Sequence, residues 1–251
     1  MTTELTTDAF LGGKLQILQP RRGYRAGVDP VLLAASIAAK PGQSVLELGC
    51  GVGVASLCLA ARLPGLTLTG VELQVDYAAL ARRNAMANDA PLTVITADLR
   101  ALPAKLRQKR FDHVIMNPPY FDRAMGTAAT DQGRDMALGG DTPLASWLDI
   151  GARRLGPKGY LSMIQRIERL PEVLAALDGR LGSLIVRPIA GREGRPPELF
   201  LLRARQEGRA AFQMAPALVM HQGAVHLGDA ESYTAAVGNV LRNGAALDIL
   251  P

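Results

Sequence analysis

The sequence is poor in the residues that build disulfide frameworks and metal centres. Its two cysteines, Cys50 and Cys58, lie close together without the spacing of a zinc site, so we expect neither a disulfide nor a bound metal. The three histidines, His113, His221 and His226, form no cluster, and His113 lies inside a predicted strand, where a structural role is favoured. Such sparse cysteine is typical of a reducing compartment, and the cytoplasm is the expected location.

Long hydrophobic runs are also missing. No segment approaches the ~18 consecutive apolar residues that cross a bilayer, and we expect no membrane partner. Residues 1–4 lack the basic region and apolar stretch that open a signal peptide. Hydrophobic residues still make up 48% of the 251 residues, which is enough for one large α/β core or two small ones. The net charge of +5 and the isoelectric point near 9.5 favour a polyanionic partner such as nucleic acid.

Apolar segments and turn signals alternate along the chain in the manner of a doubly wound α/β sheet. Strands are predicted at 44–48, 66–71, 92–96, 111–116 and 160–164, and helices at 54–63, 76–88, 142–155 and 171–177. This alternation indicates a mostly parallel sheet. Two further strands, 184–189 and 199–205, are joined by a connection too short for a crossover helix, so they should be antiparallel.

The first forty residues are expected to form a leader ahead of the main domain. Alternation around Leu15 and Ile17 predicts a hairpin. Asp29 followed by Pro30 predicts a helix N-cap, with the helix running to about Ala39. We therefore expect a leader at 1–40, made of a hairpin and a helix packed on the core, and a main domain at 41–251, together forming a single globular unit.

A glycine-rich turn follows the strand at 44–48. Gly49, Gly51 and Gly53 permit tight backbone geometry and close approach of a ligand to the main chain. The spacing departs from a dinucleotide fingerprint, because Val54 stands where the last glycine or alanine belongs. A ligand smaller than a pyrophosphate is therefore favoured, and a nicotinamide-dependent oxidoreductase is disfavoured.

Three acids stand at or near the carboxyl ends of successive predicted strands. Glu72 is placed to accept hydrogen bonds from both ribose hydroxyls of a nucleoside. Asp98 is placed to accept from an adenine amino group, although either acid alone could be a loop or capping residue. Glu47 lies within its strand, and a buried carboxylate without a partner costs several kcal/mol, so a cationic ligand would suit it. Together the three acids indicate a site for an adenosine that carries positive charge.

The segment Asn117-Pro118-Pro119-Tyr120 ends the strand at 111–116. The two prolines stop the strand and remove two backbone donors. The turn then offers the Asn117 amide, the Pro118 carbonyl and the Tyr120 ring at the edge where open α/β sheets bind ligands. Two acceptors and a stacking ring suit a planar amine conjugated to a ring or a carbonyl, whereas the simpler interpretation is a strand-ending turn with a buried tyrosine.

The glycine turn, the acids and the proline turn together resemble class I S-adenosylmethionine-dependent methyltransferases, in the branch that methylates amino nitrogens. The leader segments 23–29 and 32–35 are similar to the bacterial tRNA(Val) adenine N6-methyltransferase family, whose members modify the adenine immediately 3′ of the anticodon. The resemblance implies a Rossmann-like, mostly parallel sheet of seven strands with an antiparallel strand near the C-terminus. It also implies S-adenosylmethionine as cofactor, tRNA as partner and N6-methylation of adenine as the activity.

The resemblance assigns roles to individual residues. For catalysis it implies Asn117, Pro118 and Tyr120. For cofactor binding it implies Tyr24, Arg25, Gly27, Glu47, Gly49, Cys50, Gly51, Glu72, Leu73, Asp98, Leu99 and Asn117. Pro119 and Phe121 are expected beside the target base.

Arginines in glycine- or proline-rich segments are the candidates for holding RNA phosphates. They are Arg21, Arg22 and Arg25 in the leader, Arg123 in the segment 121–141, and Arg192 and Arg195 near the C-terminal strands. The segment 121–141 is long and lacks periodicity, and we expect a mobile substrate loop there. The basic run 105–110 precedes a strand, should lie at the amino edge of the sheet, and is expected to be a solvated face.

Other targets stay open at this point, because N2-guanine rRNA and N5-glutamine protein methyltransferases use the same four residues on conjugated planar amines. Glutamine enzymes carry a helical domain ahead of the cofactor motif, and only 44 residues precede Val45. DNA enzymes usually add a recognition domain that is not evident here, whereas unpaired RNA loop bases are accessible targets. A non-catalytic module that binds adenosine ligands or RNA is the alternative from a different class.

Overall fold

The computed structural model describes residues 4–120, 142–177, 179–223 and 232–251. The strands are β1 (Leu5–Phe10), β2 (Leu15–Pro20), β3 (Ser44–Leu48), β4 (Thr67–Glu72), β5 (Leu92–Thr96), β6 (Phe111–Met116), β7 (Leu155–Arg166), β8 (Leu181–Arg192), β9 (Pro197–Gln206), β10 (Gln213–Met214) and β11 (Leu218–His221). The helices are α1 (Asp29–Ser36), α2 (Val54–Arg62), α3 (Val75–Ala87), α4 (Ala104–Gln108), α6 (Leu144–Arg154), α7 (Leu170–Ala176) and α8 (Ala235–Asn243). Short 3-10 turns lie at Leu11–Gly13, Leu99–Ala101 and Ile167–Arg169.

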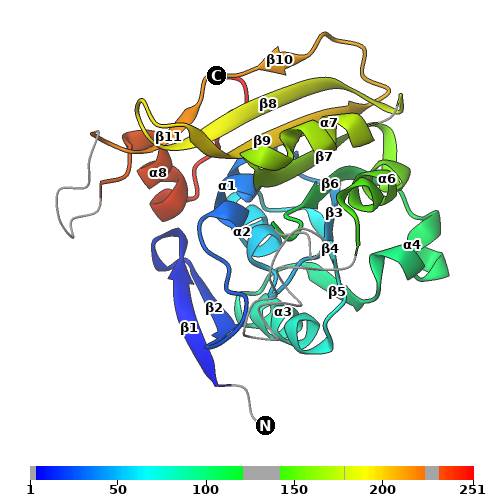
Figure 1. The fold of residues 1–251 in the computed structure, drawn as a ribbon. Coiled ribbons are helices and arrows are strands. Elements are labelled where there is room, and N and C mark those ends of the chain that lie inside the picture. The colour runs from blue at the N-terminus through cyan, green and yellow to red at the C-terminus, as the bar shows by residue number, and fades with distance from the viewer. Residues whose placement is uncertain (1–3, 121–141, 178, 224–231) are drawn as a thin grey trace.

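A central sheet organises the molecule (Figure 1). Its main strands follow the order β8-β9-β7-β6-β3-β4-β5, and β9 runs antiparallel to both of its neighbours, β7 and β8. The other pairs in the sheet are parallel, which confirms the doubly wound, mostly parallel class and the antiparallel strand near the C-terminus. The short strands β10 and β11, which the sequence did not predict, both pair with β8 and bring the sheet to nine strands in the described part of the chain.

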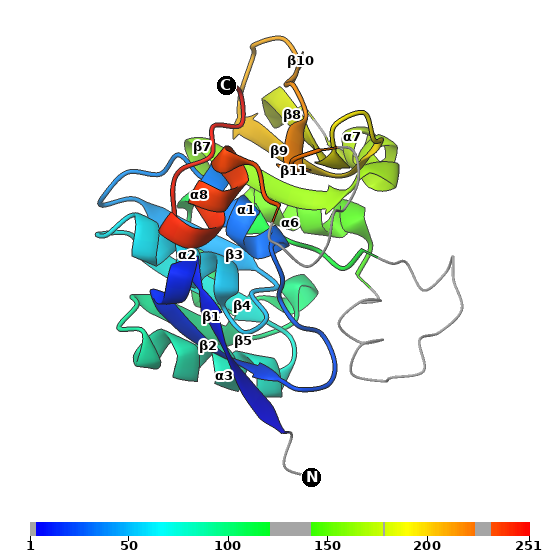
Figure 2. The same ribbon diagram turned by 90° about the vertical axis from the view of Figure 1, so that its left-hand side faces the viewer.

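Both faces of the sheet are covered. The hairpin β1–β2 and the helices α1, α2, α3 and α8 lie on one face, which is turned towards the viewer in Figure 2, and α4, α6 and α7 lie on the other. Neighbouring residues of β6 belong to different cores, with Ile115 on the first face and Val114 and Met116 on the second. Because both faces are buried, these strands appear in the sequence as continuous apolar runs.

The leader hairpin is held on α3 by two asparagines, and its prediction is confirmed. The Asn84 amide is fully buried, accepts from the Leu18 N–H at 2.8 Å and donates to the Leu18 carbonyl at 3.0 Å. Asn88 makes the same pair with Gln16, at 3.0 and 2.9 Å. Residues four apart on a helix share a face, as do alternate residues of a strand. The two amides therefore bond the exposed edge of β2 as a neighbouring strand would.

The predicted cap of α1 is wrong. Val28 occupies the N-cap position without a side-chain hydrogen bond, and the helix ends at Ser36 rather than near Ala39. The Asp29 carboxylate lies in the first turn and accepts from the Tyr120 hydroxyl instead of from the helix backbone.

The C-terminal segment completes the core on the face that carries the leader. Its helix α8 is capped by Thr234, whose side chain accepts from the Val237 N–H. The Leu247 N–H donates to the Ala35 carbonyl of α1. None of the helices in the four described ranges is long and apolar enough to span a membrane.

Candidate functional site

A cleft opens at the carboxyl ends of β3, β4, β5 and β6. Of the residues predicted for the site, it is lined by Tyr24, Glu47, Gly49, Cys50, Gly51, Glu72, Leu73, Asp98, Leu99, Asn117, Pro118, Pro119 and Tyr120. The cleft contains about 1240 Å³ of space, its open mouth included.

Glu72 is held at the end of β4 by backbone amides. One carboxylate oxygen accepts from the Gly51 N–H and the other from the Gln74 N–H, both at 2.8 Å. The side chain is buried, and burial raises the pKa of Glu72 against the opposing effect of these backbone donors. The Leu73 backbone also acts as a donor to Glu72, and since a carboxylate can accept about four hydrogen bonds, Glu72 keeps capacity for a further donor.

Glu47 is the most deeply buried acid of the cleft. Its Oε2 accepts from the Ser56 N–H at 3.0 Å and from the Ser56 hydroxyl. Ser56 lies in the first turn of α2, where backbone N–H groups have no partner within the helix. Burial is the main cause that raises the pKa of Glu47 to about 7, and nearby Glu72 adds to it. The charge on Glu47 therefore changes near neutral pH, and a cationic ligand would favour the ionised form.

Asp98 is already engaged with a basic neighbour. Its Oδ2 lies 2.8 Å from Nη2 of Arg100, and its Oδ1 accepts from the Arg100 N–H at 2.8 Å. The hydrogen bond from Arg100 holds the pKa of Asp98 below its usual range. A ligand amine at Asp98 would therefore share this carboxylate with Arg100, a lining residue that the sequence analysis did not single out.

Arg25 points to the leader hairpin. Its guanidinium donates to Asp8 at 2.5 Å, to the Thr6 hydroxyl at 2.6 Å and to the Pro20 carbonyl at 3.0 Å. Neither Arg25 nor Gly27 is among the residues that line the cleft. Their predicted contact with the cofactor thus stays a prediction that this geometry does not favour.

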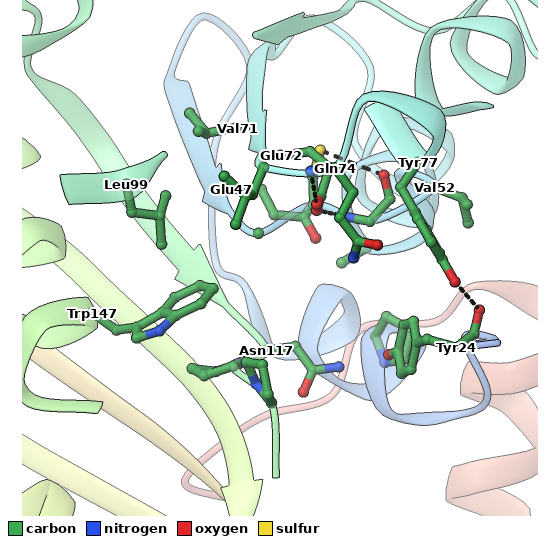
Figure 3. Close-up of a pocket in the computed structure, with 18 of the residues that line it drawn as sticks. Tyr24, Glu47, Val52, Val71, Glu72, Gln74, Tyr77, Leu99, Asn117 and Trp147 are labelled. Atoms are coloured by element: carbon green, nitrogen blue, oxygen red, sulfur yellow. Dashed lines mark hydrogen bonds between the residues drawn. The ribbon is translucent and has the colours of Figure 1, made fainter. Parts of the chain in front are cut away.

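The Asn117 side chain faces the cleft with an unused acceptor. Its Oδ1 is buried and has no hydrogen-bond partner among the described residues. In Figure 3 the Asn117 amide lies between Trp147 and Tyr24, with Glu47 and Glu72 further into the cleft. Because an unsatisfied buried acceptor costs ~1–3 kcal/mol, this oxygen suits a site that receives a donor from a ligand.

The turn after Asn117 is held by side chains from distant elements. The Gln165 amide of β7 donates to the Pro118 carbonyl at 3.3 Å and to the Pro119 carbonyl at 3.4 Å. The Tyr120 hydroxyl donates to Oδ2 of Asp29 at 2.5 Å. Burial, and then the charge of Asp29, raise the pKa of Tyr120, so its hydroxyl stays neutral and its ring is held at one end.

Trp147 of α6 is a wall of the cleft that sequence reasoning missed. A β-carbon placed on Gly49 would lie 2.5 Å from Cη2 and 2.9 Å from Cζ3 of the indole, and Gly49 has a φ of +66°. Only glycine fits at position 49, because the ring packs on its Cα. Trp147 is the single tryptophan of the chain, and that rarity was the only available signal.

Comparisons with known proteins agree with this geometry. A family profile described as Methyltransferase small domain matches residues 26–134. A tRNA1(Val) (adenine(37)-N6)-methyltransferase of Porphyromonas gingivalis is 32% identical over 178 residues, which cover 67% of this chain and 69% of that protein. A protein of the same description from Shewanella baltica is 33% identical over 66% of this chain and 72% of its own length. The chain belongs to the tRNA1(Val) (adenine(37)-N6)-methyltransferase family.

Solved structures support the family's fold. A predicted O-methyltransferase from Agrobacterium tumefaciens matches with a TM-score of 0.71 and 27% identity, covering 88% of this chain and 98% of that one. The 16S rRNA N2 G1207 methyltransferase of T. thermophilus, solved with AdoMet and guanosine, matches with a TM-score of 0.55 and 18% identity over 81% of this chain and 50% of that one. The second likeness shows the fold alone. Membership of a methyltransferase family implies S-adenosylmethionine as the methyl donor.

Of the residues predicted to contact RNA phosphates, those that the structure describes are absent from the cleft lining. Phe121, Arg123 and the expected loop 121–141 lie outside the described residues. Arg192 donates to the carbonyls of Gln222 and Gly223, which ties the end of β8 to the C-terminal segment. Arg195 is exposed in the connection between β8 and β9. Because β8 is parallel to β7, this connection lies at the same edge of the sheet as the cleft.

The remaining basic residues named in the sequence analysis lie on the leader and near α4. Arg21 forms an exposed ion pair with Glu4 at 3.2 Å, and Arg22 is exposed beside it. The basic run 105–110 overlaps α4 and precedes β6, so it lies at the amino edge of the sheet. The contacts of Arg21 and Arg22 with RNA, and the solvated role of the basic run, stay predictions.

Proposed function

We propose that this chain transfers a methyl group from S-adenosylmethionine to the N6 amino group of adenine 37 in tRNA1(Val). The observation that carries the proposal is the buried Oδ1 of Asn117, which has no hydrogen-bond partner among the described residues and belongs, like Pro118, to the cleft lining. Two acceptors on adjacent residues match the two hydrogens of a conjugated amino group. Relatives that act on adenine 37 of tRNA1(Val) support the choice of base and position.

The target wall, which we define as Asn117, Pro118 and Tyr120, acts on an adenine amino group. This amino group is a poor nucleophile, because the nitrogen lone pair is delocalised into the ring. Asn117 and the Pro118 carbonyl accept the two amino hydrogens and favour a more tetrahedral nitrogen. These hydrogen bonds strengthen as positive charge develops on nitrogen, so they stabilise the transition state more than the ground state. The Tyr120 ring stacks on the base, an interaction worth ~1–3 kcal/mol. A strong base is unnecessary, since the methylated nitrogen loses its proton readily.

The cofactor wall, which we define as Glu47, Glu72, Asp98 and Leu99, has the acceptors that a cationic nucleoside needs. S-adenosylmethionine supplies a methyl group activated by a sulfonium cation. Glu72 keeps acceptor capacity for a ribose hydroxyl beside its backbone donors. Glu47, buried near it, is stabilised as a carboxylate by a nearby positive charge. Asp98 and Leu99 lie just after β5. The Asp98 carboxylate accepts from the adenine amino group, and the Leu99 side chain covers the adenine ring.

A labelling experiment tests the proposal. The purified chain is incubated with methyl-labelled S-adenosylmethionine and a tRNA1(Val) transcript that carries either adenine or guanine at position 37. Nucleoside mass spectrometry should find labelled N6-methyladenosine with the adenine transcript and no labelled nucleoside with the guanine transcript. If rRNA or a glutamine-containing peptide is supplied instead, label in N2-methylguanosine or in glutamine would show that one of the alternative targets, and not adenine 37, is the substrate.

Variants separate catalysis from binding. Asn117→Ala should lower the labelling rate about 10²–10³-fold, the usual effect of removing one donor or acceptor from a transition-state site, and should spare cofactor affinity. Asn243→Ala, which removes an exposed amide at the end of α8, is the matched control and should label at the wild-type rate. Cofactor binding without label on any substrate would indicate the non-catalytic module.

A further inference from the structure

β7 extends beyond β6 at the edge of the sheet that carries the cleft. Met116, the last residue of β6, lies opposite Met163 of β7. Two residues further on, the parallel register would bring Pro118 alongside Gln165. Proline has no N–H to donate to a ladder, so regular pairing cannot continue there.

The Gln165 side chain occupies the place where the ladder stops. It is fully buried, and its Nε2 donates to the carbonyls of Pro118 and Pro119. Its Oε1 accepts from the Arg166 N–H at 2.8 Å. One amide thus supplies a donor to the two prolines, whose backbone has only acceptors, and an acceptor to the end of its own strand. The backbone of Gln165 pairs with Phe200 of β9, which fixes where this side chain begins.

The hydrogen bond from Gln165 can affect the reaction through the Pro118 carbonyl, which is also a proposed acceptor for the target amine. A carbonyl oxygen has two lone pairs and can accept from Gln165 and from a target amine together. Gln165 is not among the residues that line the cleft, so the described structure gives it no direct access to a substrate. Its effect on the reaction must pass through the position of the turn.

We propose that Gln165 is a positioning residue that aims the Pro118 carbonyl, and with it Asn117, at the target nitrogen. This inference rests on the proposed function, because it concerns the acceptor pair that function requires. A misplacement of the order of 1 Å at a reacting group can lower the rate about 10²-fold, so a residue outside the cleft can control turnover.

The test uses Gln165→Met, which keeps the length of the side chain and removes both its donor and its acceptor. We expect kcat for the adenine-37 transcript to fall about tenfold or more, while KM for tRNA and Kd for S-adenosylmethionine stay within about twofold. Gln165→Glu retains the acceptor for the Arg166 N–H and should lose a similar factor in kcat when ionised, which assigns the effect to the donor. Ser162→Ala, at another buried polar residue of β7, is the matched control and should keep the wild-type kcat.

The outcomes are distinguishable. A wild-type kcat in Gln165→Met, with Asn117→Ala inactive, overturns this inference and leaves the proposed function standing. Loss of cofactor affinity in parallel with kcat, or a protein that no longer folds in both Gln165 variants, shows a general scaffold role and also overturns it. If the wild-type enzyme labels a different planar amine, the proposed base is wrong, and the same comparison is made on that product. A wild-type protein that labels no amine overturns both proposals.

Discussion

The two walls of the cleft are held by different kinds of interaction. On the cofactor wall, Glu47 bonds Ser56 nine residues away, and Glu72 bonds the backbone of Gly51 and Gln74 in the adjoining turns. On the target wall, Tyr120 reaches Asp29 across 91 residues of sequence. The contacts on the first wall thus join residues at most 21 positions apart, at the ends of two neighbouring strands, whereas the second wall exists only once distant elements are packed.

Substitution of Glu47 should reveal how much the buried carboxylate destabilises the cofactor-free protein at high pH. Its pKa is raised from 4.5 to about 7, so the folded state holds this proton more tightly than the unfolded state. The contribution of Glu47 to stability is then greatest below pH 4.5 and is lost as the pH rises to 7, by up to about 3 kcal/mol. Glu47→Gln should raise the melting temperature of the cofactor-free protein at pH 8 and have little effect at pH 4.5. An equal shift at both pH values would contradict the desolvation argument.

Glu72 and Asp98 should differ in their effect on cofactor affinity. Glu72 is buried and bonded only to uncharged backbone donors, whereas Asp98 is shared with Arg100. Glu72→Ala should weaken S-adenosylmethionine binding by about 1.5–3 kcal/mol, the range for hydrogen bonds to a charged group. Asp98→Ala should weaken it less, as measured by isothermal titration. Affinities in both variants equal to wild type would remove the two acids from the cofactor site.

The link from Tyr120 to Asp29 should affect only the target wall. Tyr120→Phe, which removes the donor, and Asp29→Ala, which removes the acceptor, should each raise the activation free energy that kcat/KM for tRNA reports by about 1 kcal/mol, the net worth of a typical hydrogen bond. Because both changes remove the same bond, the double variant should be no slower than the more impaired single one. Tyr160→Phe, on β7 and absent from the cleft lining, is the control. Additive losses in the double variant would show that Tyr120 and Asp29 act independently.

The smallest effect is expected at the exposed connection between β8 and β9. Arg192 also holds the C-terminal segment, so its removal would mix two effects, and Arg195 is the cleaner choice. If Arg195 contacts one phosphate, Arg195→Ala should flatten the salt dependence of tRNA binding by about one unit and leave cofactor binding unchanged. An unaltered slope would exclude this connection from the RNA surface.

Sequence patterns alone brought the residues of the proposed cofactor wall together at one edge of the sheet. The bounds of β3, β5 and β6 match their predictions, because each is a short apolar run that ends at a glycine, an acid or a proline. The same patterns place Glu72 and Asn117 at strand ends, and parallel strands bring those ends to one edge. Charge, chain order and turn chemistry were sufficient here because each feature depends on residues near it in the sequence.

Tertiary packing decided which groups hold these residues in place. Asp29 appeared to be a helix cap and is instead the acceptor for Tyr120, and Gln165 had no feature that set it apart from other strand residues. Trp147 excludes any side chain at position 49, and this requirement for glycine arises only when α6 lies against the glycine turn. Periodicity reports which side of an element is buried, but not which element covers it. That choice is made by contacts between residues far apart in the chain, whose free energy exists only in the folded protein.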